Sequence, residues 1–117
     1  MIERVECIVP VLPVKNLAAS LDFYTTILGF QRDWGGDRPE SIIAGISHGG
    51  KSMMLLQQRE VSPVTVWLGV GDVRTLHARC AERGLRIIQP PMNHPWAEDM
   101  RVEDPDGNEL WFGSEPR

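Results

Sequence analysis

The sequence predicts an α+β fold made of two tandem β-α-β-β-β modules. The same order of strand and helix signals occurs twice, and each copy contains one helix with a capping residue before it and a glycine after it. Val14–Leu17 matches Val70–Val73, 56 positions later, and Gly29–Phe30 matches Gly84–Leu85, 55 positions later. The nearly constant offset indicates a duplicated unit.

Module one begins with an apolar, β-branched stretch, Glu6–Val14, whose two prolines indicate an edge strand or a bent strand. Asn16 is a good N-cap for the helix that follows, and Gly29 suits the left-handed position that ends it. Apolar residues recur between them at helical spacing, at Leu17, Leu21, Tyr24 and Leu28. Three strands separated by glycine-rich turns are expected next, at Phe30–Trp34, Ser41–Ser47 and Ser52–Gln58.

Module two repeats this order. Pro63–Gly71 is expected to be a strand, and Asp72 caps a second helix that ends at Gly84. The inner stripe of this helix is expected to contain Val73, Leu76 and Cys80. Three further strands are expected at Leu85–Gln89, Asp99–Asp104 and Glu109–Gly113, with Asp106-Gly107 making the last turn.

We expect the 117 residues to form one domain, since single domains most often contain roughly 100–150 residues. Module one is expected at about 5–58 and module two at about 63–113. In each module the helix covers one face of the sheet and leaves the other face open. Two modules placed together are expected to curve these faces into a half-open barrel around a cavity, and barrel mouths commonly bind small molecules.

The charge and the cysteine content exclude several classes of function. A net charge of −4 argues against a nucleic-acid surface, which needs a clustered basic face. No apolar stretch approaches the roughly 18–20 residues of a membrane span. Cys7 and Cys80 fit no CxxC spacing, so we expect two buried thiols and a cytoplasmic location.

Two motifs, one in each module, suggest a family. Module one contains Val14-Lys15-Asn16-Leu17, then Ser20, Phe23-Tyr24 and Leu28-Gly29-Phe30. Module two ends with Trp96, then Val102–Asn108, which includes Asp-Pro-Asp-Gly-Asn, and Glu109–Phe112. At this separation, over essentially the whole chain, they resemble the vicinal-oxygen-chelate superfamily of glyoxalases, bleomycin-resistance proteins and dioxygenases. The resemblance implies a homodimer, with modules paired within one chain or by exchange between two chains.

The resemblance also implies metal-ligand positions on inward-facing strands, as in the metal enzymes of the superfamily. Matched by motif spacing, these positions fall on Val9, Leu55, Thr65 and Trp111. None of them offers imidazole, thiolate or carboxylate, and the neighbouring Ile8, Met54, Val66 and Leu110 are no better. We therefore expect no metal and no cofactor, as in the metal-free branch that resembles bleomycin-resistance proteins.

Metal-free members of the superfamily use the same concave face as an aromatic-lined pocket. Because side chains alternate along a strand, Glu109 should share a face with Trp111, Trp67 with Thr65, and Met53 and Gln57 with Leu55. Trp34, Trp96 and His94 are expected at the mouth. The predicted ligand-binding residues are Trp67, Trp111, Met53, Leu55, Gln57, Thr65, Val9, Glu109, Trp96, Trp34 and His94. Planar, aromatic or partly cationic ligands suit this wall, at roughly 0.5–2 kcal/mol per good contact.

One of these residues, Glu109, is costly to bury as an unpaired charge. Three alternatives stay open for it: it faces solvent, it pairs with Arg101 of the neighbouring strand, or it meets a cationic ligand.

Three functions are compatible with this pattern. The first is a metal-independent protein that sequesters an aromatic or planar molecule, such as an antibiotic, without a catalytic residue. The second is a lyase or dioxygenase whose metal is held by His94 with Glu98, Asp99 or Glu103. The third is a subunit or interaction module without a ligand. The four tryptophans favour the first function over the third, and the missing metal ligands and the lack of a recognisable nucleophile–base pair weigh against an enzyme.

Overall fold

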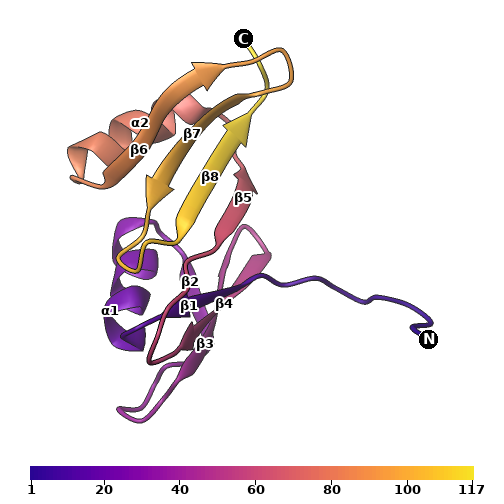
Figure 1. The fold of residues 1–117 in the computed structure, drawn as a ribbon, viewed down its shortest axis with the longest axis vertical. Coiled ribbons are helices and arrows are strands. Elements are labelled where there is room, and N and C mark those ends of the chain that lie inside the picture. Colours follow the sequence, from indigo (N-terminus) through magenta and orange to yellow (C-terminus); the bar gives the residue numbers. More distant parts are fainter. The chain divides into compact units, whose positions relative to one another are not determined.

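A computed structural model describes residues 1–117 as two compact units, 1–60 and 61–117 (Figure 1). Unit one contains β1 (Val11–Val14), α1 (Leu17–Asp22), a π-helical turn η1 (Phe23–Ile27), β2 (Gln31–Gly35), β3 (Ile43–His48) and β4 (Lys51–Gln57). Unit two contains β5 (Thr65–Gly69), α2 (Val73–Glu82), β6 (Arg86–Asn93), β7 (Glu98–Glu103) and β8 (Glu109–Ser114).

The two units have the same topology, which confirms the predicted duplication and the α+β class. Each holds one four-stranded sheet, with strand orders β1-β4-β3-β2 and β5-β8-β7-β6. The outer pairs β1–β4 and β5–β8 are parallel, and the remaining pairs are antiparallel. The two sheets are separate, and the half-open barrel that needs both units together stays a prediction.

The same contacts fasten the first turn of the helix in both units. The predicted caps are confirmed: Asn16 Oδ1 accepts from the Ala19 N–H at 3.0 Å, and Asp72 Oδ1 accepts from the Arg74 N–H at 3.0 Å. A strand residue adds a second bond in each unit. Gln57 Oε1 accepts from the Leu17 N–H at 2.8 Å, and Ser114 Oγ accepts from the Val73 N–H at 3.2 Å. These acceptors satisfy N–H groups that a helix start leaves without an intrahelical partner.

The first helix is shorter than predicted. Its α-helical part ends at Asp22, and a π-helical turn carries the chain to Ile27. The predicted stop at Gly29 is correct, because this glycine adopts the left-handed region with φ of +81°. The first strand begins at Val11 rather than Glu6, and residues 1–10 before it are largely exposed.

Strand β6 is longer than predicted, since it continues past Gln89 through Pro90 and Pro91 to Asn93. Proline lacks the N–H that a central strand requires, which disfavours Pro90 and Pro91 inside a strand. β6 is the edge strand of its sheet, and its register with β7 shifts between Gln89 and Met92. An edge position and an irregular register are the two places where a sheet accommodates proline.

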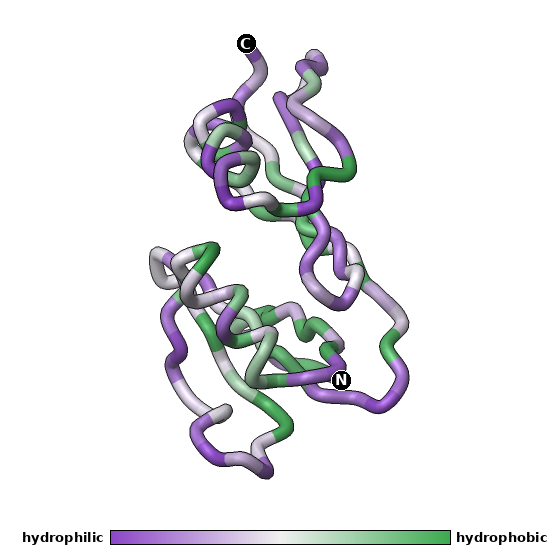
Figure 2. Tube along the Cα trace, turned by 90° about the vertical axis from the view of Figure 1, so that its left-hand side faces the viewer, coloured by the Kyte–Doolittle hydropathy of each residue, from purple (hydrophilic) through white to green (hydrophobic).

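Each unit buries its core between one sheet face and its helix. In unit one the fully buried side chains include Leu12, Val14, Tyr24, Ile46 and Leu55. In unit two they include Val73, Met100, Val102 and Leu110. Figure 2 shows hydrophobic stretches within both units and hydrophilic stretches in the loops between elements. Cys80 is buried as predicted, whereas Cys7 is exposed, because it lies in the segment before β1. No helix has the length and apolar character of a membrane span.

Candidate functional site

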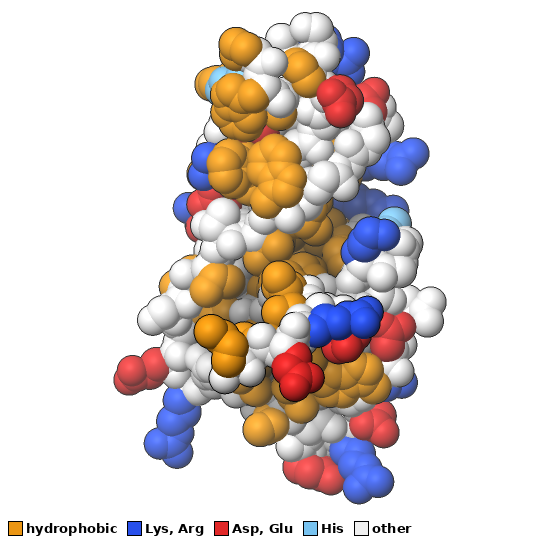
Figure 3. Space-filling view, turned by 90° about the vertical axis from the view of Figure 1, so that its right-hand side faces the viewer, with side chains coloured by type: hydrophobic (Ala, Val, Ile, Leu, Met, Phe, Trp, Pro, Cys, Tyr) orange, Lys and Arg blue, Asp and Glu red, His pale blue; other side chains and the backbone are white.

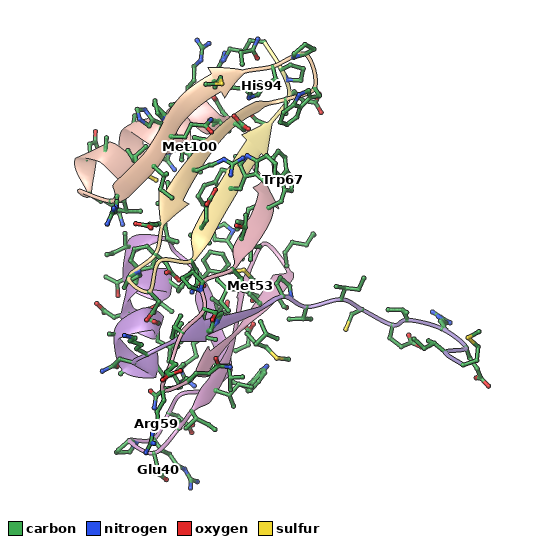
Figure 4. The ribbon with its side chains drawn as sticks, in the orientation of Figure 1. Glu40, Met53, Arg59, Trp67, His94 and Met100 are labelled. Atoms are coloured by element: carbon green, nitrogen blue, oxygen red, sulfur yellow. The ribbon has the colours of Figure 1, made fainter.

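The open face of unit two is the face of its sheet turned away from α2. Ser114 binds the start of α2, so Trp111, three residues earlier on β8, points to the opposite face. Strand register places Trp67 of β5 and Arg101 of β7 directly beside Trp111. Figure 4 shows Trp67 on the side of the sheet away from α2, and Figure 3 shows hydrophobic side chains gathered on this face.

Four rings on this face form what we call the aromatic patch: Trp67, Trp96, Trp111 and His94. Trp67 and Trp96 both meet Trp111 edge to face, with ring centroids 4.9 and 6.4 Å away and interplanar angles of 86° and 85°. His94 stacks on Trp96, with ring centroids 4.6 Å apart and an interplanar angle of 6°. Trp67 and Trp96 remain 46% and 58% exposed. An exposed cluster of large rings on a sheet face is the kind of surface that binds a partner or a ligand.

A buried carboxylate, Asp99, orders three side chains around the patch. Trp111 Nε1 donates to Asp99 Oδ2 at 2.9 Å, and Gln89 Nε2 donates to Oδ1 at 2.8 Å. His94 Nε2 is within hydrogen-bonding distance of the same Oδ1, at 3.1 Å. Asp99 is only 2% exposed, and this burial opposes ionisation, but the bonds from Trp111, Gln89 and His94 outweigh it and lower the pKa of the carboxyl group.

A cation lies over the central ring of the patch. The guanidinium carbon of Arg101 is 4.3 Å from the centroid of the Trp111 ring, a cation–π contact. Arg101 Nη1 also donates to Glu109 Oε1, so of the three alternatives for Glu109 the structure shows pairing with Arg101. Thr65 pairs with Glu109 across β5 and β8 and shares this face, as predicted from strand alternation.

A glycine lies beneath two of the three exposed tryptophans, Trp67 and Trp34, and allows the ring to lie on the sheet. A Cβ atom on Gly113 of β8 would overlap the Trp67 ring. In unit one, a Cβ atom on Gly45 of β3 would likewise overlap the ring of Trp34, which is 44% exposed. Trp34 therefore lies on the open face of unit one, and Val9 precedes β1 and is half-buried.

Three predicted site residues on β4 are not available on an open face. Gln57 binds the start of α1, so Leu55 and Met53, at even spacing from it, also point to the helix-covered face and are buried. The prediction that Met53, Leu55 and Gln57 share one face is correct, but that face is covered by the helix and is not the open one. Met54, one residue away, points to the open face, where it pairs with Val11 and with Gly45, the glycine beneath Trp34.

The residues present do not fit a divalent metal. Neither unit contains a group of three or more His, Cys, Asp or Glu side chains placed to hold an ion. In the alternative set, only Asp99 approaches His94. Glu98 is bound by Arg74 and Arg117, and Glu103 is bound by Arg86. One imidazole and one carboxylate that already accepts hydrogen bonds fall short of the three or four protein ligands of a zinc site.

Asp99 and Gln89 support the aromatic patch of the candidate site, and the sequence did not reveal this. The sequence indicates Asp99 only as a possible metal ligand, whereas in the structure its carboxylate holds Trp111 and His94. Strand alternation carries a signal for this role of Asp99. Asp99 lies two positions before Arg101 on the same strand, so it shares the face on which Arg101 can pair with Glu109.

Comparison with known proteins gives one family and a set of similar folds. The family model of the glyoxalase/bleomycin resistance protein/dioxygenase superfamily matches residues 4–112. TioX from Micromonospora sp. ML1 superimposes with a TM-score of 0.84 at 20% identity, covering 95% of this chain and 99% of that one. TnmS3, an antibiotic binding protein from Streptomyces sp. CB03234, superimposes with a TM-score of 0.79 at 24% identity, covering 98% of this chain and 100% of that one. A glyoxalase/bleomycin resistance protein/dioxygenase from Nocardioides superimposes with a TM-score of 0.77 at 22% identity, covering 100% of this chain and 87% of that one. The comparison with curated proteins finds no match.

Proposed function

We propose that this chain, which belongs to the glyoxalase/bleomycin resistance protein/dioxygenase superfamily, is a metal-independent binding protein for a planar aromatic small molecule such as an antibiotic. The observation that carries the proposal is the aromatic patch, in which Trp67 and Trp96 are half-exposed around an ordered Trp111. Binding of this kind protects the cell by sequestering the small molecule, and it requires no catalytic residue.

The patch is suited to stacking because its rings are already held in place. Trp111 is fixed by its bond to Asp99 and by Arg101 over its ring, and Trp96 is supported by His94. A rigid binding surface loses less conformational entropy when the ligand binds. Each good aromatic contact contributes about 0.5–1.5 kcal/mol beyond the area it buries, so three indoles supply affinity without a metal.

The chemistry of the fold supports the same function. The metal-ligand positions inferred from the family motifs hold no imidazole, thiolate or carboxylate, and the residues near His94 do not replace them. TnmS3, which shares the fold, is an antibiotic binding protein. Glu109 and Arg101 add partly exposed polar groups at the edge of the patch that can select among planar ligands.

Tryptophan fluorescence of chelator-treated protein tests the proposal against a panel of planar aromatic compounds. We expect saturable quenching that Trp67→Ala weakens and that added zinc, nickel or manganese does not change. Trp34→Ala is the matched control, since Trp34 is equally exposed and also lies on a glycine, but belongs to unit one. Binding that appears only after a metal ion is added, or no response to any compound, would overturn the proposal.

Two further features stay predictions. The homodimer follows from the family resemblance, and light scattering on the purified protein tests it. The cytoplasmic location is tested by fractionating cells that express the protein.

A further inference from the structure

We propose that Arg117 is a positioning residue for the aromatic patch, because it fastens both ends of the loop that carries His94 and Trp96. This loop, residues 94–97, joins β6 to β7. The inference rests on the proposed function for its consequence, since the patch is the surface that would bind the ligand. We call the contacts of Arg117 with Asn93, Glu98 and Asp72 the Arg117 clasp.

The backbone of Arg117 holds the first end of the loop. Its N–H donates to Asn93 Oδ1 at 2.9 Å, and Asn93 Nδ2 donates to its carbonyl oxygen at 3.2 Å. Asn93 is the last residue of β6 and pairs with Glu98, the first residue of β7. A reciprocal pair of bonds at this position fixes the chain just before His94.

The guanidinium of Arg117 holds the second end. Nε donates to Glu98 Oε1 at 2.9 Å, and Nη2 donates to Asp72 Oδ1 at 2.8 Å. Glu98 is 1% exposed, and its burial opposes ionisation, but the hydrogen bonds from Arg74 and Arg117 lower its pKa, so it stays ionised. Because Asp72 is the N-cap of α2, the clasp also ties the base of the loop to the helix.

Consecutive carboxylates of β7 therefore secure the loop from the two faces of the sheet. Glu98 points towards α2 and binds Arg117, whereas Asp99 points to the open face and binds His94 and Trp111. Within the loop, the His94 N–H donates to the Ala97 carbonyl at 2.8 Å. The direction of Trp96, the most exposed ring of the patch, thus depends on how firmly both ends of this short turn are held.

The ring-proton chemical shifts of His94 test the clasp without any ligand. Stacking on the indole of Trp96 shields these protons, so they should lie upfield in the wild-type NMR spectrum. We expect Arg117→Ala, which removes the guanidinium contacts, and Asn93→Ala, which removes the contacts with the backbone of Arg117, each to move them downfield. The double variant should move them further than either single variant, because the two substitutions release different ends of the loop. Arg74→Ala is the matched control: it also removes one bond to Glu98, at 2.8 Å, but leaves the contacts of Arg117.

Affinity for proflavine, a planar aromatic dye, gives the functional readout. We expect Arg117→Ala to weaken it by about three- to tenfold, the size of one aromatic contact, and Arg117→Lys to recover part of the loss. Unchanged His94 shifts in folded Arg117→Ala, or equal changes in Arg117→Ala and Arg74→Ala, would overturn the inference. If the wild type bound neither proflavine nor the panel, the proposed function would fail, while the His94 shifts would still decide whether the clasp positions the loop.

Discussion

The open faces of the two units are built on matching backbone positions but carry different side chains. Strand pairing and the shared fastening of the helices, through Gln57 in one unit and Ser114 in the other, align the positions. In this alignment Val11, Met54, Gly45 and Ile43 of unit one correspond to Trp67, Trp111, Arg101 and Asp99 of unit two. Aliphatic residues and a glycine thus stand in one unit where aromatic and charged residues stand in the other.

This difference shows that the backbone supplies the positions and the side chains supply the site. Asp99 is stable when buried because Trp111, Gln89 and His94 all donate to it. In unit one the corresponding residue is Ile43, and the residue in place of Trp111 is Met54, which offers no N–H. A carboxylate at position 43 would lack the indole donor. The comparison predicts that ligand binding belongs to unit two. The first two of the four experiments below test this location, and the last two test the burial of Asp99 and of Cys80 in unit two.

The largest effect is expected when the central ring of the patch is replaced by the residue that unit one carries. Trp111→Met removes two edge-to-face contacts, the cation–π contact with Arg101 and the bond to Asp99. We expect affinity for the quenching compound to fall by about 10- to 100-fold, measured by fluorescence titration. Met54→Leu on the open face of unit one should leave affinity unchanged, and an equal loss would contradict the assignment of the site to unit two.

The two glycines beneath the exposed tryptophans allow a matched test. Gly113→Ala forces Trp67 off β8, and Gly45→Ala forces Trp34 off β3. We expect the first variant to weaken binding by about three- to tenfold, and the second to leave binding unchanged. The same titration measures both, and circular dichroism verifies that both variants are folded. Similar affinities in the two variants would show that Trp67 does not contact the ligand.

A smaller, pH-dependent effect is expected on stability. The fold lowers the pKa of Asp99 below its ordinary value of 3.8, so the ionised group stabilises the protein above that value. This contribution is lost as the pH falls through the lower pKa of the folded state. Asp99→Asn should lower the free energy of unfolding by about 1–2 kcal/mol at pH 7, and the difference should narrow below about pH 4. Urea unfolding between pH 3 and 7 measures it, and a constant difference would contradict the role of the charge.

The smallest expected effect is a difference in thiol reactivity between the two cysteines. Cys7 in unit one is exposed, whereas Cys80 of α2 is buried and its burial raises the pKa of the thiol. Since the thiolate is the reactive form, Cys7 should react rapidly with a thiol reagent in the folded protein and Cys80 only after unfolding. Labelling of Cys7→Ser measures this, and rapid reaction of that variant would indicate that unit two opens readily.

Local signals predicted much of the fold and part of the site. The caps Asn16 and Asp72 act within one turn of helix, so a short stretch of sequence is enough to place them. Strand alternation correctly grouped Thr65 with Trp67 and Trp111 with Glu109, and the ion pair of Glu109 with Arg101 is one of the three alternatives that the sequence left open. These features depend on neighbours close in sequence or on a single strand pairing.

Tertiary structure decided which face each group occupies and what connects the elements. Leu55 is buried rather than open because Gln57 of the same strand binds the start of α1, 40 positions away in the sequence. The hydrogen bond of Trp111 with Asp99 and the Arg117 clasp likewise join residues that are far apart in the sequence, and Arg117 lies 45 positions from Asp72. By itself the sequence determined the duplicated units, their caps and their alternating strands, because those depend on short-range preferences. The faces and the polar connections depend on packing between distant segments, which only the folded chain brings together.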